Sequence, residues 1–307
     1  MKRNERPEKG DIVRSRCRGR ATQRPAPAEP EARCSEHCDR PIGVFDSGLG
    51  GLTVLAAMRR ALPRENFIYF GDTARVPYGT KSPEAVTRFS SEITAWLVAK
   101  GIKTLVVACN TASSVALDAV RAAAAGVPVT GVIEPGAAAF AASGGRKVLV
   151  IGTAATVASR AYGRALRRAA PGALVTEQAC PLFVPLVEEG WSDPARGRRA
   201  AALTRLAAEE YLSPYRGKGY DSLILGCTHY PLLRNVIARV MGRKINIIDS
   251  AEAAALSVRE TLAREGLLRR TGRGSVSFFV SDAPERFSAL AAALLGIKPG
   301  KVGVKRL

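Results

Sequence analysis

Short apolar runs alternate with longer stretches of mixed polarity from Pro41 to the end of the chain. Because these runs are rich in Val, Ile, Leu and Phe and are bounded by polar residues or glycine, they predict β-strands. The predicted strands cover residues 42–45, 67–70, 104–108, 127–133, 147–151, 174–177, 222–225, 245–248 and 276–280.

Most of the stretches between these runs are rich in Ala, Leu, Arg and Glu, which favour helices. Clear examples are residues 83–99, 198–211 and 252–265. Strands that are apolar throughout and alternate with helices indicate parallel sheets covered on both faces. We therefore expect an α/β protein whose chemistry lies at the carboxyl ends of the strands.

The length of 307 residues suits one large domain or two modest ones. Residues 122–142 form the most apolar long stretch, but Pro128, Glu134 and Pro135 interrupt it, so no membrane span is expected. The first residues lack the apolar core of a secretory signal, and six scattered cysteines do not suggest a disulfide scaffold. A reducing, cytoplasmic setting is the resulting expectation.

Residues 1–40 are polar, contain many Arg and Pro residues and lack apolar periodicity, which predicts a disordered basic extension. Cys17, Cys34, His37 and Cys38 in this segment are of types that bind zinc. Their spacing matches no common zinc module, and the segment offers no core to hold one. We therefore expect no metal site.

The formal net charge is +19, and most of it belongs to the chain after residue 40. Such a charge favours anionic partners, either small carboxylates or nucleic acid, although a biased amino-acid composition explains it equally simply. No nucleic-acid-binding motif is present, and aromatic residues make up only 6% of the chain. Nucleic-acid contact is thus expected only as a secondary property of the basic surface.

Two predicted strands end in glycine-containing turns. The segment that follows a strand is called its exit, and the first exit is Asp46-Ser47-Gly48-Leu49-Gly50-Gly51. Its glycines would let the backbone approach an anionic ligand, or the segment is an ordinary turn in which Asp46 or Ser47 caps a helix. It is not a dinucleotide-binding fingerprint, because its glycines do not give the order G-x-G-x-x-G. The second exit contains Tyr78 and Gly79, which could line a pocket or form an ordinary loop.

Two other predicted strands end in cysteine. Cys109 is followed by Asn110 and Thr111, and Cys227 is followed by Thr228 and His229. A single cysteine after a buried strand is usually an inert small apolar residue. Two cysteines at matched exits, one in each half of the chain, favour a shared function instead.

Each cysteine is expected at the start of a helix, where backbone N–H groups lower a thiol pKa and bring the thiolate within reach at neutral pH. Asp46 and His229 are candidates to orient these thiols or to relay protons. If two similar lobes face each other, one thiolate removes a proton from a ligand while the opposite thiol delivers one. That reaction inverts a stereocentre.

These exits, together with Pro77-Tyr78-Gly79 and the segment from Pro181 to Glu189, resemble the glutamate racemase family of the aspartate/glutamate racemase superfamily. The resemblance spans about residues 41–285 and leaves the extension outside. It implies two pseudo-symmetric parallel-sheet α/β lobes with the active site in the cleft between them. The implied lobes are residues 41–133 plus 249–307, and residues 134–248.

The resemblance also implies interconversion of L- and D-glutamate without a cofactor or metal, which supplies D-glutamate for peptidoglycan, and often a homodimer. Cys109 would be the base acting on D-glutamate and Cys227 the base acting on L-glutamate, assisted by Asp46 and by His229 with Glu188, respectively. The implied substrate-binding residues are Asp46, Ser47, Tyr78, Gly79, Asn110, Thr111, Thr228 and His229. Cys180 has no counterpart role and is expected to be structural.

Three alternatives remain open from the residues. An aspartate racemase or other superfamily member would keep the paired cysteines and differ in the loops around Tyr78 and Glu188. A pyridoxal-dependent racemase would need a lysine, and no lysine lies at the four exits. A single-cysteine hydrolase or decarboxylase would need only one of the two thiols.

Overall fold

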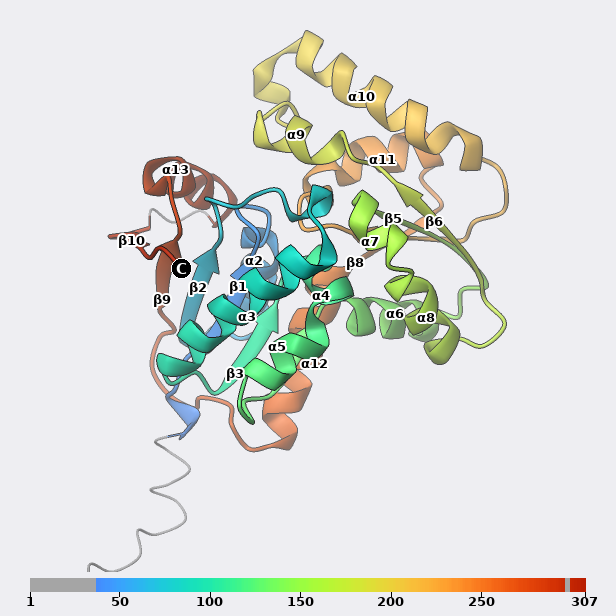
Figure 1. Cartoon of the computed structure of the whole chain (residues 1–307). Helices are drawn as coiled ribbons and strands as arrows, with labels where there is room; N and C mark the ends of the chain where they lie inside the picture. The colour runs from blue at the N-terminus through green and yellow to red at the C-terminus, as the bar shows by residue number, and fades with distance from the viewer. Residues whose placement is uncertain (1–36, 296–298) are drawn as a thin grey trace, which may run out of the picture.

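The computed structural model describes residues 37–295 and 299–307 and contains two separate parallel sheets (Figure 1). All strand pairings in both sheets are parallel. The six-stranded sheet has the order β10 (Gly303–Val304), β9 (Val276–Val280), β2 (Phe67–Gly71), β1 (Ile42–Asp46), β3 (Thr104–Val107), β4 (Val129–Gly131). The four-stranded sheet has the order β6 (Leu174–Ala179), β5 (Lys147–Gly152), β7 (Ser222–Gly226), β8 (Asn246–Asp249). The predicted α/β class is confirmed.

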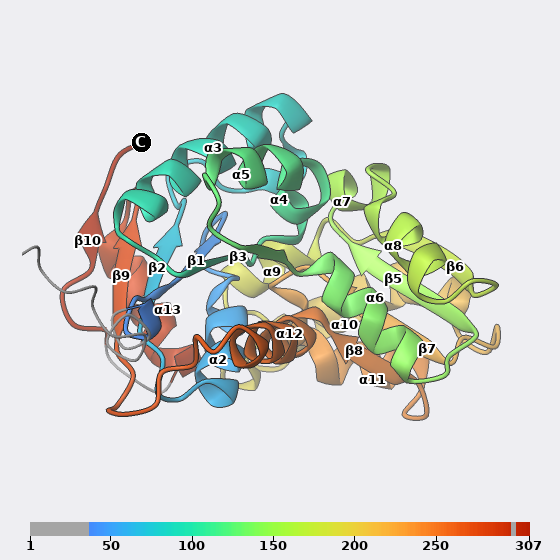
Figure 2. The ribbon, with the colours of Figure 1, turned by 90° about the horizontal axis from the view of Figure 1, so that it is seen from below.

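Helices cover both faces of the six-stranded sheet, which is why its central strands are apolar throughout (Figure 2). On one face pack α3 (Pro83–Ala99), α4 (Asn110–Val115) and α5 (Leu117–Ala123). On the other face pack α2 (Leu52–Ala61), α12 (Ser250–Arg264) and α13 (Pro284–Leu295). Each face has its own apolar core.

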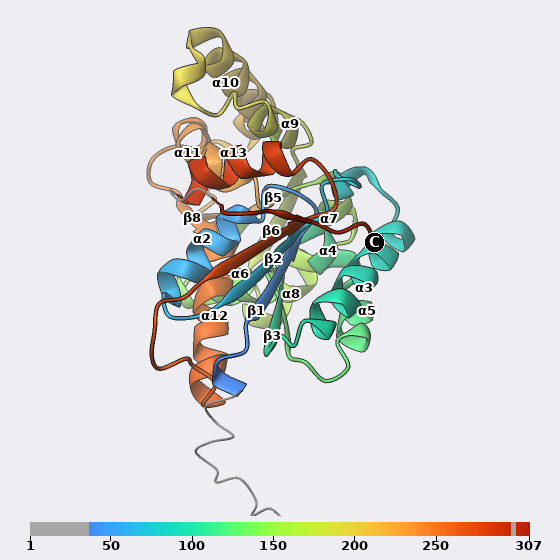
Figure 3. The same ribbon diagram turned by 90° about the vertical axis from the view of Figure 1, so that its left-hand side faces the viewer.

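The four-stranded sheet is covered in the same way. One face packs against α6 (Ile133–Ala142) and α8 (Ala161–Ala169), and the short α7 (Ala154–Ala158) follows β5. The other face packs against α9 (Phe183–Glu188), α10 (Arg198–Leu212) and α11 (Arg234–Met241), which Figure 3 shows gathered at one end of the molecule.

Two helices carry the chain between the sheets. The chain leaves β4 through α6 to reach β5, and it returns from β8 through α12 to reach β9. α12 packs against both α2 and α6, so the two connections lie together at the junction (Figure 2). The carboxyl ends of both sheets consequently face a common space.

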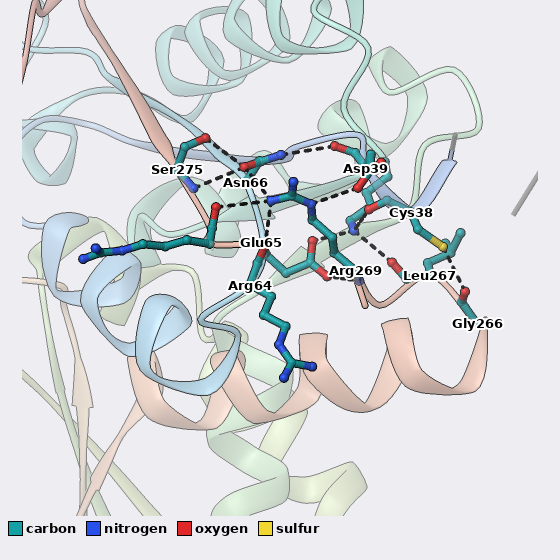
Figure 4. Close-up of polar contacts among 11 residues, drawn as sticks. Cys38, Asp39, Arg64, Glu65, Asn66, Gly266, Leu267, Arg269 and Ser275 are labelled. Atoms are coloured by element: carbon teal, nitrogen blue, oxygen red, sulfur yellow. Dashed lines mark hydrogen bonds and ion pairs between the residues drawn. The ribbon is translucent and has the colours of Figure 1, made fainter. Parts of the chain in front are cut away.

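A buried ion pair ties the first sheet together at the opposite, amino ends of its strands (Figure 4). Lys103 Nζ lies 2.5 Å from Glu65 Oε2, and both side chains are almost fully buried. Lys103 also donates to the carbonyl oxygens of Cys38 and Leu267, and Glu65 Oε1 accepts from the Arg269 backbone N–H. This network joins the segment after α12 to the starts of β1 and β3.

The predicted helix 83–99 is confirmed, and the other two agree to within two residues. The predicted strand 127–133 is too long: β4 is Val129–Gly131, and Ile133 begins α6. The error arises because one apolar run continues from a buried strand into a buried helix, which periodicity cannot separate. The strand β10 was not predicted, because two residues are too few to show a hydrophobic pattern.

Most of the predicted extension, including Cys17 and Cys34, lies outside the described residues. Within the described part, no helix has the length and hydropathy that crossing a membrane requires. The same residues contain no cluster of three or more His, Cys, Asp or Glu side chains that could hold a metal ion.

Candidate active site

A cavity of about 360 Å³ lies between the carboxyl ends of the two sheets, lined by residues from both. The structure brings ten of the eleven predicted site residues to its wall: Ser47, Tyr78, Gly79, Cys109, Asn110, Thr111, Glu188, Cys227, Thr228 and His229. The eleventh, Asp46, is fully buried just behind the wall. No lysine is among the described residues that line this cavity.

Cys109 sits at the end of β3 and caps the N-terminus of α4. Its Sγ accepts from the Ala112 backbone N–H at 3.5 Å. Burial and the neighbouring Asp46 carboxylate nevertheless raise the pKa of Cys109 to about 12. The expectation that helix N–H groups would bring this thiol within reach of neutral pH is therefore wrong, because burial and Asp46 outweigh them. The free structure holds Cys109 as a thiol.

Cys227 sits at the end of β7, and a 3-10 turn, Tyr230–Leu233, separates it from α11. His229 Nδ1 lies 3.8 Å from its Sγ, and His229 Nε2 lies 3.2 Å from Glu188 Oε1. Burial alone would lower the pKa of His229, but the contacts with Cys227 and Glu188 raise it to about 10. The second thiol thus faces an imidazolium that a carboxylate holds in place.

Asp46 lies where the two lobes meet. Its Oδ2 accepts from the Gly48 backbone N–H at 3.0 Å, and its Oδ1 accepts from the Thr228 hydroxyl of the other lobe at 3.4 Å. Burial raises the pKa of Asp46, although the charge of His229 and nearby backbone N–H groups oppose the rise. This carboxylate therefore contacts the residue next to Cys227 and also acts on Cys109 through its charge.

The glycine-rich turn after β1 permits the close approach of the lobes. A Cβ at Gly50 would collide with the side chains of Thr228 and His229. The Thr53 hydroxyl at the start of α2 donates to the Thr228 carbonyl oxygen at 2.9 Å. This hydrogen bond holds the segment after Cys227 against the first lobe. Glycine is needed at Gly50 to bring the second thiol's segment up to the first lobe.

Tyr78 lines the cavity, and its hydroxyl points to a buried carboxylate. That hydroxyl donates to Asp72 Oδ2 at 2.5 Å, and Arg75 Nε donates to the same oxygen at 2.7 Å. Ser281, which follows β9, donates to Asp72 Oδ1. Asp72 therefore anchors the loop that carries Tyr78 and Gly79.

Thr153 and Thr156 were not predicted from the sequence. Thr153 follows β5, lines the cavity and caps α7, and its hydroxyl lies 3.0 Å from both the Thr111 and the Thr156 hydroxyls. The Thr111–Thr153 bond crosses between the lobes. The strand exit Ile151-Gly152-Thr153 has the same apolar-small-polar construction as the cysteine exits and could have identified them.

Cys180 lies in the core of the second lobe, away from the cavity lining. It packs with Phe183 and Tyr230, and the Tyr230 hydroxyl donates to its carbonyl oxygen. Burial raises the pKa of its thiol. These contacts agree with the structural role expected for this residue.

Comparison with known proteins gives one consistent result. Residues 42–258 match the Asp/Glu/Hydantoin racemase family. The chain is 52% identical over 265 residues to glutamate racemase of Geobacter metallireducens, covering 85% of this chain and 94% of the relative. The structure is similar to glutamate racemase of Francisella tularensis in complex with D-glutamate, with TM-score 0.80, 36% identity and coverage of 87% and 98%.

A second solved structure, glutamate racemase of Thermus thermophilus in complex with beta-chloro-D-alanine, gives TM-score 0.77 and 49% identity, with coverage of 88% and 98%. The similarity therefore extends over both lobes and the cavity between them.

Proposed function

Because this chain belongs to the Asp/Glu/Hydantoin racemase family and catalyses the glutamate racemase reaction, we propose that Cys109 and Cys227 are its two bases. The observation that carries this assignment is one cavity lined by two thiols, each at a matched strand exit of a different lobe. D-Glutamate, one of the two interconverted enantiomers, serves peptidoglycan synthesis.

In the L-to-D direction, the Cys227 thiolate removes the α-proton of L-glutamate, and the Cys109 thiol delivers a proton to the opposite face. The reverse direction exchanges these roles. The free structure suits the first direction, since Cys109 holds its proton firmly and His229 places a positive charge beside Cys227. His229 thus assists Cys227, Glu188 holds the imidazolium, and Asp46 assists Cys109.

The two carboxylates of glutamate bind to hydroxyl, amide and backbone donors around the cavity. The predicted donors are Ser47, Asn110, Thr111, Thr228 and the backbone of Tyr78 and Gly79, to which the structure adds Thr153. An α-proton is weakly acidic, so these donors must stabilise the negative charge that develops when it leaves. No lysine lines the cavity among the described residues, which supports a reaction without a pyridoxal cofactor.

Racemisation in deuterium oxide tests the proposed chemistry. With either enantiomer as substrate, the product should carry one deuterium at the α-carbon from its first appearance, because its proton comes from an exchangeable thiol. Product that retains the substrate's α-hydrogen would contradict delivery by the opposite thiol. Parallel assays should show faster turnover of glutamate than of aspartate.

The division into lobes of residues 41–133 plus 249–307 and residues 134–248 remains a proposal. The assignment of strands to the two sheets supports it, since α6 and α12 carry the chain between them. Closure of these lobes would exclude water from the cavity during proton transfer. We place the enzyme in the cytoplasm, where amino-acid precursors of peptidoglycan are made.

The proposed assembly is a homodimer. Leu203 and Leu206 on α10 are about half exposed, and Leu182 before α9 is similarly exposed. These exposed apolar side chains support the packing of another subunit on the second lobe. Sedimentation equilibrium measures the assembly directly, and a monomer at all concentrations would contradict it.

A further inference from the structure

Tyr162 is a fully buried tyrosine on α8 that the proposed chemistry leaves without a role. Its ring belongs to the apolar core of the second lobe, together with Ile133, Phe140 and Leu166. The ring also packs against Gly226, where a Cβ would come within 3.0 Å of Tyr162 Cε2. Since Gly226 directly precedes Cys227, this ring supports the backbone that carries the second thiol.

The hydroxyl of Tyr162 points out of this core toward the first lobe. It donates to Asn110 Oδ1 at 2.7 Å, and Asn110 is the residue directly after Cys109. α4 and α8, which carry the two residues, are in contact. One side chain therefore touches the neighbours of both thiols.

Asn110 is almost fully buried and lines the cavity, yet its Nδ2 has no hydrogen-bond partner within the described protein. A side-chain amide has one acceptor oxygen and two N–H donors. With Oδ1 taken by Tyr162, only the donor end remains, and a buried donor without a partner is unfavourable. A carboxylate oxygen in the cavity is the group that satisfies it.

We propose that Tyr162 is a positioning residue that fixes the Asn110 amide with its N–H donors available to a substrate carboxylate. The opposite amide orientation would present Oδ1 to the carboxylate and repel it. The Ser250 hydroxyl, which also lies near the phenol, donates instead to the Leu225 carbonyl oxygen at 3.0 Å. The hydrogen bond of the phenol goes to Asn110 Oδ1 at 2.7 Å, and this bond sets the amide before substrate arrives.

This inference rests on the proposed binding role of Asn110, and it predicts a specific pattern of kinetic effects. Tyr162→Phe keeps the ring against Gly226 and removes only the hydroxyl. The amide is then free to rotate, so KM for glutamate should rise and kcat/KM should fall about tenfold. The two enantiomers have equal free energy, so kcat/KM must fall equally in both directions.

A double-mutant cycle distinguishes positioning from a general loss of stability. Tyr162→Phe, Asn110→Ala and the double variant are compared with the parent enzyme. If Tyr162 acts through Asn110, the double variant has the same kcat/KM as Asn110→Ala alone. Multiplied losses, or a Tyr162→Phe enzyme within twofold of the parent, would overturn the inference.

Tyr220→Phe is the matched control. It removes a hydroxyl from the same lobe that donates to Thr176 Oγ1 at 2.8 Å and lies outside the cavity. This variant should keep the parent KM, while D-glutamate affinity measured by calorimetry should weaken about tenfold in Tyr162→Phe alone. If the parent fails to racemise glutamate, the proposed function is wrong. If the parent racemises and Tyr162→Phe binds D-glutamate unchanged, only the positioning role is wrong.

Discussion

The Cys109 and Cys227 exits both follow a buried parallel strand, but they differ in the element that follows and in the charge that faces each sulfur. Cys109 ends a buried parallel strand beside the Asp46 carboxylate, whereas Cys227 ends its strand beside the His229 imidazolium. Burial and Asp46 raise the pKa of Cys109 to about 12, while the contacts with Cys227 and Glu188 raise the pKa of His229 to about 10.

Pseudo-symmetric lobes therefore need not supply two chemically equivalent bases. A two-base racemase needs one thiolate and one thiol at the start of each turnover. The unequal charges favour the protonated form of Cys109 and place the His229 cation beside Cys227 before substrate binds. Removing the charge beside Cys227 and removing the charge beside Cys109 should therefore change catalysis in different ways.

His229→Asn should have the largest effect among these charge changes. It removes the cation beside Cys227 and the group that can exchange a proton with this sulfur. We expect kcat to fall by about 10²- to 10⁴-fold in both directions, as for loss of a general acid–base partner. Steady-state kinetics by circular dichroism measures this, and near-parent kcat would remove His229 from the mechanism.

Asp46→Asn should lower kcat by about 10- to 100-fold and change the titration of Cys109. Removing the carboxylate takes away a charge that disfavours the thiolate, so the pKa of Cys109 should fall from about 12. The rate of thiol alkylation against pH, measured in a Cys227→Ser background, reports this pKa. The parallel Ser47→Ala variant keeps the charge but removes a hydroxyl whose hydrogen bond lowers the pKa of Cys109, so it should move the titration in the opposite direction, to higher pH. An unaltered Cys109 titration in Asp46→Asn would contradict the effect of the Asp46 charge on this thiol.

Glu188→Gln should have a smaller effect near neutral pH, about three- to tenfold in kcat/KM, with a clear signature in alkali. Burial opposes ionisation of Glu188, but its bond with His229 outweighs this and lowers its pKa. Without this carboxylate the pKa of His229 should fall from about 10, because one of the contacts that oppose the effect of burial is lost while the contact with Cys227 remains. The alkaline limb of the kcat/KM profile should consequently move to lower pH. A limb at the parent position would exclude His229 as its source.

The same pKa shift predicts how stability depends on pH. The folded pKa of His229 lies above its ordinary value of about 6.5, so the protonated pair with Glu188 stabilises the fold fully below that pH. This contribution declines as pH rises and is lost through about pH 10. Denaturant unfolding from pH 6 to 10.5 should show a steeper loss for the parent than for Glu188→Gln.

Lys103→Met should have the smallest effect on catalysis, because it changes charge at the end of the sheet remote from both thiols. Removing one partner of the buried pair with Glu65 leaves an unpaired buried charge, which costs about 3–5 kcal/mol of unfolding free energy. The exposed Lys244→Met is the matched control and should change stability little. A stable Lys103→Met with impaired kcat would show that charges act on the site over longer distances than proposed.

The sequence was sufficient to predict the elements and residues whose local pattern is distinctive. The apolar strands ending in Cys109 and Cys227 identified the two exits, and parallel-sheet geometry implied that polar residues after such strands meet at one cavity. The glycines after Asp46 predicted a close backbone approach to a ligand, whereas the close approach in the structure is that of Gly50 to the Thr228 and His229 side chains.

What could not be predicted depends on contacts between distant segments. Tyr162 reads as an ordinary apolar helix residue, since its hydrogen bond to Asn110 spans the two lobes. Thr153 ends a strand with the same apolar-small-polar pattern as the cysteine exits, but its contact with the Thr111 hydroxyl joins distant segments and follows only from packing. The pKa of Cys109 was misjudged because the helix N-terminus is visible in the sequence, whereas burial and the Asp46 charge follow only from packing.

Exchange of the α-hydrogen by single-cysteine variants tests the division of labour between the two thiols most directly. Cys109→Ser and Cys227→Ser are incubated with each enantiomer in deuterium oxide, and α-deuterium in the remaining substrate is measured by NMR. We predict that neither variant racemises at more than a thousandth of the parent rate, that Cys109→Ser exchanges L-glutamate preferentially, and that Cys227→Ser exchanges D-glutamate preferentially. Near-parent racemisation by either variant, or the same enantiomer preference in both, would contradict two bases acting from opposite lobes.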